Sequence, residues 1–178
     1  MIMLLAGCAS LPPPPMPARD ALRDFALDGR FALRVSRPEQ PAQSSAGRLS
    51  WIHQQDSDRI QLANPLGYAV AEIETTPGQS RLRTANGQIH EANDPETLLE
   101  SVTGQRLPLS RLPGWLLGRG EQINRDAQGR PAQLREAGWQ VDYNYDSDAP
   151  DALPSRLDIR YPDEIELKLR IETWKEAP

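Results

Sequence analysis

Residues 164–171 read Glu-Ile-Glu-Leu-Lys-Leu-Arg-Ile, an unbroken alternation of charged and apolar side chains. Successive side chains of a β-strand point to opposite faces of the sheet, so this stretch predicts a strand with one apolar face and one charged face. A strand of a parallel sheet, buried on both faces, would be apolar throughout. The stretch therefore predicts an antiparallel sheet that contacts water on one side.

The same alternation recurs on the N-terminal side of this stretch, in segments separated by turn residues such as Pro77-Gly78 and Asn86-Gly87. Helical spacing replaces it in two stretches and in the short segment 18–24. The first stretch begins at Asp94 as the expected N-cap and ends at Gly104, and the second begins at Ser110 as the expected N-cap and ends at Gly118. So few short helices cannot fill a large curved sheet. We expect a mainly β fold, an incomplete, half-closed antiparallel β-barrel with the short helices as a lid over an apolar cavity. A flat sheet packed by helices is the alternative. The alternating segments are 31–35, 48–51, 59–62, 139–146 and 156–161.

Composition narrows the class of protein. The 178 residues fit one domain, and the net charge of −5 comes from 25 acidic and 20 basic residues that are interleaved along the chain. A nucleic-acid-binding protein would usually be basic, so we expect no nucleic-acid partner. The only histidines, His53 and His90, lie far apart without a metal-ligand pattern, and the chain has no phosphate-binding loop or nucleophile elbow. We expect no metal, no cofactor and no enzymatic activity.

The N-terminal region differs in composition from the rest of the chain. Residues 1–7 form an apolar run that ends in small residues, and Leu5-Ala6-Gly7-Cys8 is similar to a bacterial lipobox, in which the cysteine is lipidated. The run is short and has no preceding Lys or Arg, so we expect it to be a truncated signal peptide. A proline-rich segment follows Cys8, and such a segment favours an extended chain. We therefore predict a lipidated cysteine and tether over 8–24 and a β domain over 25–178.

The sequence Asn64-Pro65-Leu66-Gly67 connects two predicted strands. Asn, Pro and Gly favour an exposed turn, which places Leu66 near the tip of a loop. A single exposed leucine is common on protein surfaces and does not by itself indicate function.

Short motifs spread over residues 25–174 together resemble the LolB family of outer-membrane lipoproteins. The clearest is the run 62–67, Leu-Ala-Asn-Pro-Leu-Gly. The others are Phe31-Ala32-Leu33 after Gly29-Arg30, Gly47 to Trp51, Gly104 with Leu107-Pro108-Leu109, Trp115 to Gly118, Gly138-Trp139 with Tyr143, Leu153-Pro154, and Ile171 to Trp174. The lipobox is consistent with this resemblance, because the family is itself lipidated.

The resemblance implies a function. A member would be anchored by lipid in the outer membrane, face the periplasm, accept lipoproteins from the periplasmic carrier LolA and insert them among the phospholipids of that membrane. The motif match assigns Leu66 to the loop that the family uses for membrane insertion. We expect a monomer whose acylated cargo enters the cavity. From the strand alternation and the helical spacing, we predict that the cavity is lined by Phe31, Leu33, Leu49, Trp51, Ile60, Leu62, Leu99, Leu116, Val141 and Leu167.

Two alternatives fit parts of the same sequence. A structural or assembly lipoprotein would have the same tether but a filled core. An envelope hydrolase would have a cleft in which ionisable groups converge. A hollow large enough for a lipid chain distinguishes the first alternative from the LolB-like function.

We predict that Cys8 carries lipid and is the first residue of the mature chain. Mass spectrometry of the protein extracted from native membranes should show an acylated Cys8. Replacing Cys8 by Ala should leave the fold intact, because the predicted β domain begins well after the anchor. An unmodified Cys8 thiol, or a mature chain that starts elsewhere, would contradict this prediction.

Overall fold

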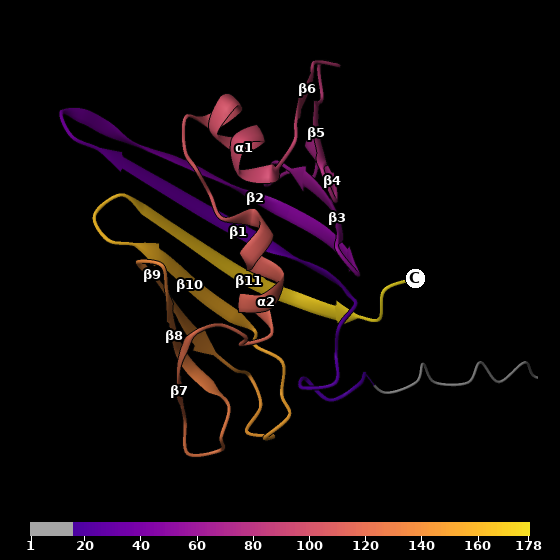
Figure 1. The fold of residues 1–178 in the computed structure, drawn as a ribbon, viewed down its shortest axis with the longest axis vertical. Coiled ribbons are helices and arrows are strands. Elements are labelled where there is room, and N and C mark those ends of the chain that lie inside the picture. Colours follow the sequence, from indigo (N-terminus) through magenta and orange to yellow (C-terminus); the bar gives the residue numbers. More distant parts are fainter. Residues whose placement is uncertain (1–15) are drawn as a thin grey trace, which may run out of the picture.

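The computed structural model describes residues 16–178, so Cys8 and the predicted signal segment lie outside the described residues. The described chain forms one antiparallel sheet with two short α-helices and a 3-10 turn (Figure 1). The predicted mainly β class is confirmed. The elements are β1 (Phe25–Arg37), β2 (Gln40–Gln54), β3 (Ser57–Ala63), β4 (Ala69–Thr76), β5 (Gln79–Thr84), β6 (Ile89–Ala92), α1 (Pro95–Thr103), η1 (Leu109–Arg111), α2 (Leu112–Leu116), β7 (Gln122–Arg125), β8 (Pro131–Glu136), β9 (Trp139–Asn144), β10 (Arg156–Tyr161) and β11 (Ile165–Lys175).

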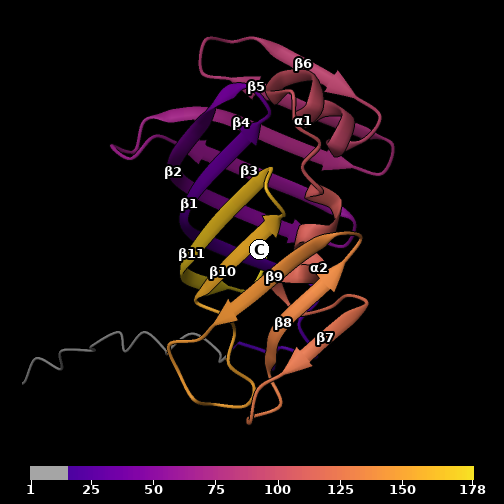
Figure 2. The same cartoon turned by 90° about the vertical axis from the view of Figure 1, so that its left-hand side faces the viewer.

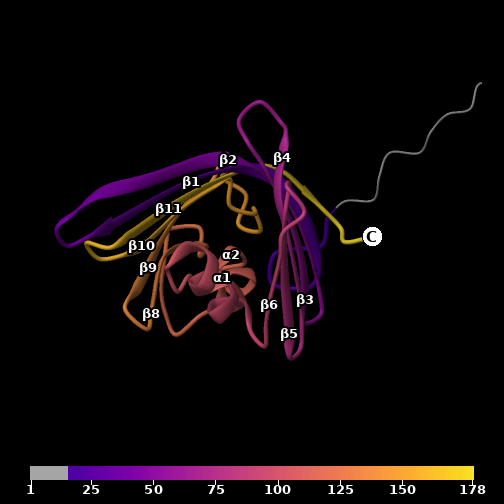
Figure 3. The same cartoon turned by 90° about the horizontal axis from the view of Figure 1, so that it is seen from above.

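The sheet is strongly curved and does not close. Its strand order is β6-β5-β4-β3-β2-β1-β11-β10-β9-β8-β7, so β6 and β7 are its two edges. The strands bend around α1 and α2, which lie in the hollow of the sheet (Figures 2 and 3). This arrangement is the half-closed barrel with lid helices that the sequence predicts, and the flat-sheet alternative is wrong.

The chain returns to the middle of the sheet through β11, the segment with the clearest alternation. β11 pairs with β1, and β1 pairs with β2, along most of their lengths. The β1–β11 register shifts between Asp28 and Gly29, which is a bulge. A Cβ atom on Gly29 would lie 2.3 Å from the carbonyl oxygen of Arg170, so only glycine permits this close approach of the two strands.

The first predicted helix is confirmed as α1. Asp94 caps it, accepting a hydrogen bond at its Oδ1 from the backbone N–H of Thr97 at 2.8 Å. Pro95 occupies the first turn, where a missing N–H costs nothing. Gly104 ends the helix in the left-handed region with φ 70°.

The other two helical predictions need correction. Ser110 does not cap α2, because its hydroxyl donates to Glu96 Oε1 at 2.6 Å and the chain enters α2 through the 3-10 turn η1. Residues 18–24 form a single turn in place of a helix, closed by the N–H of Leu22 donating to the carbonyl of Ala18 at 3.0 Å. Leu22 is buried, so this part of the predicted tether packs on the β domain.

One half of the concave side is a densely packed core, in which α2 lies against β8 and β9. Trp115 of α2 is buried, and its indole N–H donates to Glu136 of β8 at 3.0 Å. The hydroxyl of Tyr143 on β9 donates to the Trp115 carbonyl at 2.6 Å. Burial raises the pKa of Tyr143 above its ordinary value, so the phenol stays protonated and keeps donating this bond.

We predict that Gly29→Ala destabilises the protein by about 2 kcal/mol, because the added methyl group must push β1 away from β11. Ala32→Val is the matched control, since it adds more atoms to the exposed face of the same strand. Urea unfolding of both variants measures the difference. Equal midpoints for Gly29→Ala and the parent protein would contradict the close-approach argument.

Candidate functional site

An apolar cavity of about 340 Å³ lies between the concave face of the sheet and the segment that contains α1 and η1. Strands from both halves of the sheet form its walls, while Leu99 and Thr103 of α1 and Leu107 of the following connection cover it. Its lining residues are Phe31, Leu33, Ser45, Ala46, Leu49, Trp51, Ile60, Leu62, Ala63, Asn64, Val70, Ile73, Leu99, Thr103, Leu107, Pro108, Leu109, Leu112, Trp139, Ile159, Leu167 and Leu169.

No ionisable side chain among the described residues lines this cavity. An ionised group there would need a partner or a shifted pKa, because a low-dielectric wall disfavours charge. The polar atoms that do line it belong to short side chains such as Ser45 and Thr103, and the Thr103 hydroxyl donates to the Leu99 carbonyl at 2.7 Å. The cavity can therefore hold hydrocarbon, and its lining offers no ionisable side chain that could act as an acid or a base there.

The cover is attached to the sheet at the end of α1. The guanidinium of Arg37 at the tip of β1 donates to the carbonyls of Thr103 and Gly104, each at 3.2 Å. These carbonyls lie at the negative end of the helix, where a cation is favoured. Along the rest of its length α1 packs against β5 and β6.

Eight of the ten residues predicted to line the cavity lie on its wall. They are Phe31, Leu33, Leu49, Trp51, Ile60, Leu62, Leu99 and Leu167. Leu116 and Val141 do not line it, because both are fully buried in the packed half where α2 lies against β9. Alternation identifies the concave face correctly, but it cannot tell which part of that face a helix fills.

The sequence prediction omits several residues of the cavity lining, although the sequence contains a signal for some of them. Ile73 alternates with Glu72 and Glu74, and Leu169 alternates with Lys168 and Arg170, as expected for residues that point to the concave face. Leu107 and Leu109 lie in an irregular connection, where no periodicity indicates which side chain faces inward.

The connection between β3 and β4 holds Leu66 away from the protein. The side-chain oxygen of Asn64 accepts hydrogen bonds from the backbone N–H groups of Leu66 and Tyr68, at 3.0 and 3.1 Å. Gly67 completes the turn with φ 93°, a conformation that favours glycine. Leu66 is 83% exposed, so the structure places it at the exposed loop position that the sequence predicts.

Leu66 is not the only exposed apolar side chain there. Tyr68 is 70% exposed, and Val70 at the start of β4 is also exposed. The sequence contained a signal for Tyr68, because it directly follows the glycine of an exposed turn. These three side chains form an apolar projection, which we call the 66–70 projection.

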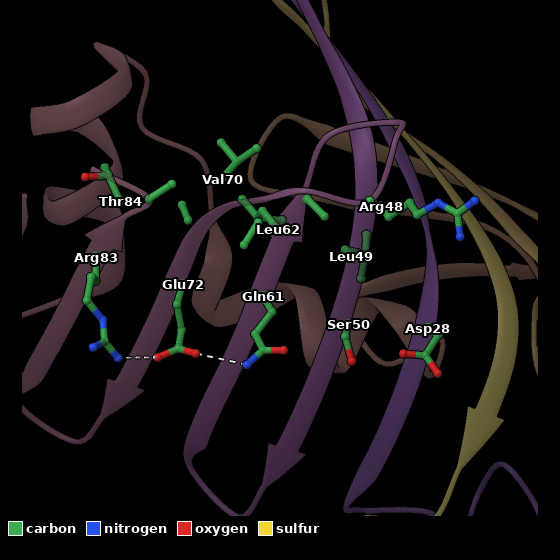
Figure 4. Close-up of a pocket in the computed structure, with 15 residues that line it drawn as sticks. Asp28, Arg48, Leu49, Ser50, Gln61, Leu62, Val70, Glu72, Arg83 and Thr84 are labelled. Atoms are coloured by element: carbon green, nitrogen blue, oxygen red, sulfur yellow. Dashed lines mark hydrogen bonds and ion pairs between the residues drawn. The ribbon is translucent and has the colours of Figure 1, made fainter. Parts of the chain in front are cut away.

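A second hollow, of about 540 Å³, lies on the convex side of the sheet beside the 66–70 projection (Figure 4). Its polar side chains bind one another: Glu72 accepts hydrogen bonds from Gln61 and from Arg83, both at 2.9 Å. Those two donors lower the pKa of the Glu72 carboxyl. Asp28, also in this hollow, binds the Lys175 ammonium at 2.6 Å, and its pKa is lowered mainly by that hydrogen bond. The side chain of Arg48, in contrast, extends away from these polar side chains (Figure 4).

A family model and several similar proteins carry the same family name. The family model "Outer membrane lipoprotein LolB" matches residues 23–174. A protein named outer-membrane lipoprotein LolB from Dechloromonas aromatica is 63% identical over 99% of this chain and 95% of its own length. Proteins of the same name from Bordetella petrii and Pseudomonas fluorescens are 34% and 33% identical, over 84% and 98% of this chain and 78% and 92% of their own lengths.

A solved structure supports the fold independently. The crystal structure of a LolA superfamily protein from Nitrosomonas europaea superposes with a TM-score of 0.50 and covers 90% of each chain, at 8% sequence identity. In the described part of this chain, no helix is long and apolar enough to cross a membrane.

We predict that shortening a side chain has different consequences in the two halves of the concave side. Leu116→Ala should cost about 3 kcal/mol of stability, because it leaves a void in a packed core. Leu33→Ala should cost clearly less, because Leu33 is half-buried and faces an existing hollow. Urea unfolding gives both values, and equal losses at the two positions would indicate a filled core with no cavity.

Proposed function

Because the chain belongs to the outer membrane lipoprotein LolB family, we propose that it accepts acylated lipoproteins from the periplasmic carrier LolA and inserts them into the outer membrane. The chain is an outer-membrane lipoprotein that faces the periplasm, and it is not an enzyme. We assign the lipid anchor to Cys8, the cysteine of the lipobox.

The uncharged cavity is the observation that carries this proposal. Moving an acyl chain through water costs about 0.8 kcal/mol for each methylene group that leaves an apolar environment. A lipoprotein therefore needs an apolar enclosure on its way to the bilayer. A hollow of about 340 Å³ with only uncharged lining side chains is suited to hydrocarbon.

A structural lipoprotein with a filled core is the weaker interpretation. Such a protein would pack α1 against the sheet as closely as α2 is packed against β9. Here Leu33, Leu62 and Leu167 are only partly buried and border the hollow. Large apolar side chains that border a hollow lose packing contacts, and this loss lowers the stability of the protein. A purely structural protein would have no reason to tolerate it.

The 66–70 projection supplies the second step, contact with the bilayer. Leu66 covers no core in the folded protein, so its transfer from water to lipid is favourable by about 1.5–3 kcal/mol when the side chain is fully buried. One leucine is too little to anchor a protein, but the lipid on Cys8 would already keep the domain near the membrane. The projection then biases the domain toward contact with lipid while cargo is released.

We predict that Leu66→Glu separates receiving cargo from delivering it. The variant should fold normally, because the side chain is exposed, and should accept lipoprotein from LolA at the parent rate. Insertion into liposomes should fall about tenfold or more, since a carboxylate replaces the apolar tip. A reconstituted assay that scores handover and insertion separately measures both steps.

Leu66→Ile and Leu66→Phe serve as controls and should remain active, because they keep an apolar side chain at the same position. Normal insertion by Leu66→Glu, or a defect at handover instead, would contradict the proposed role of the loop.

A further inference from the structure

Four arginines lie side by side on the convex face of the sheet. In the strand register, Arg156 of β10 is opposite Arg170 of β11, and Arg170 is opposite Arg30 of β1. Arg30 is in turn opposite Arg48 of β2. Directly opposite residues share one face, and all four side chains are exposed, so they form a continuous row, which we call the arginine row.

Such a row needs an explanation, because like charges directly opposite each other destabilise a sheet. The whole chain is acidic, with a net charge of −5, so the row does not follow from its composition. Two carboxylates neutralise part of the row: Glu172 binds Arg30 at 2.7 Å, and Asp146 lies 3.6 Å from Arg170. Within residues 16–178, Arg48 and Arg156 have no carboxylate within 4.0 Å. The row therefore keeps a positive charge at both of its ends.

The arginine row ends at the base of the 66–70 projection. Arg48 is opposite Ala63, the last residue of β3 before the connection that carries Leu66. That connection projects from the convex side of the sheet, the side to which β1, β2 and β11 turn their outer faces (Figure 3). An apolar projection and a row of guanidinium groups thus lie on the same side of the molecule.

We propose that the arginine row binds the phosphate groups of membrane lipids while the 66–70 projection enters the apolar layer beneath them. A guanidinium group is planar, stays charged and binds phosphate through two parallel hydrogen bonds. Neighbouring strands are about 4.8 Å apart, so four strands present these groups over roughly 14 Å. The occupant is a lipid surface because the charge complements phosphate and because the row is continuous with an apolar tip, the combination found in membrane-surface segments. This inference rests on the proposed membrane contact of Leu66.

The row fixes the orientation of the domain at the bilayer. A single apolar tip would let the domain rotate freely about the point of insertion. A line of phosphate contacts beside the tip holds the convex face toward the lipid and leaves the concave side turned toward the periplasm. The helices lie on that concave side (Figure 3), and so does the cavity. Carrier and membrane then approach different faces of the same sheet.

The experiment measures binding of the full chain to lipid vesicles. Cys8→Ala removes the acylation site, so that binding reports the protein surface. Arg48→Gln with Arg156→Gln removes the two arginines without an ion pair and leaves no carboxylate unpartnered. Arg125→Gln with Arg135→Gln changes the net charge equally, at exposed positions on β7 and β8. The vesicles are phosphatidylcholine alone, or phosphatidylcholine with about one third of the anionic lipid phosphatidylglycerol.

The Arg48/Arg156 variant should bind the anionic vesicles about tenfold more weakly than the parent, and the Arg125/Arg135 variant should lose less than about twofold. High salt should remove most of the difference, because it screens exposed charges. Unchanged binding by the Arg48/Arg156 variant, or an equal loss in both variants, would overturn the proposal. Weaker binding of LolA with unchanged vesicle binding would also overturn it, because the row would then be a carrier site.

Uptake of an acylated peptide by the same proteins keeps this test separate from the proposed function. The proposed function fails if the parent protein takes up no acylated peptide. The proposal for the arginine row is decided by vesicle binding alone, and the Arg48/Arg156 variant should take up the peptide as the parent does, because neither arginine lines the cavity.

Discussion

An apolar hollow must stay open in water, and the rest of this structure depends on that constraint. The hydrophobic effect favours collapse of such a hollow, so rigid walls must oppose it. The long ladders that join β1 to β2 and β11 supply those walls through backbone hydrogen bonds, which do not depend on contacts between side chains across the hollow. Arg37 adds a tie from the sheet to the end of α1, and the cover stays in place above the space it encloses.

The two halves of the concave side divide stability and binding between them. Around Trp115, the packed half has a fully buried core and polar ties from Glu136 and Tyr143, and it supplies the cohesion that the hollow lacks. The other half leaves Leu33 and Leu167 beside open space. The stability that the packed half supplies offsets what the half with the cavity lacks. This offset matters because the net stability of a protein is a small difference between large terms. The convex face carries a third feature, the arginine row beside the 66–70 projection.

Local sequence signals predicted the strands β1 to β3 and β9 to β11, the caps of α1 and the exposure of Leu66, because alternation, Asp94 and the Asn-Pro-Leu-Gly turn each act within a few residues. The division of the concave face could not be predicted in the same way. Leu116 and Val141 have the same periodic signal as the residues of the cavity wall, and only the position of α2 in space buries them. The arginine row could not be predicted from the sequence either, since Arg156, Arg170, Arg30 and Arg48 come side by side only through a strand order that no local pattern encodes.

The central claim is that the acyl chains of a lipoprotein enter the hollow between the sheet and α1. Photo-crosslinking tests it most directly, with a photoreactive amino acid replacing Leu33 on the cavity wall or, as the control, Ile89 on the exposed surface. After LolA hands over an acylated lipoprotein whose acyl chains carry an isotope label, irradiation should link the labelled chains to position 33 and not to position 89. Links at position 89 alone, or equal links at both positions, would contradict the account.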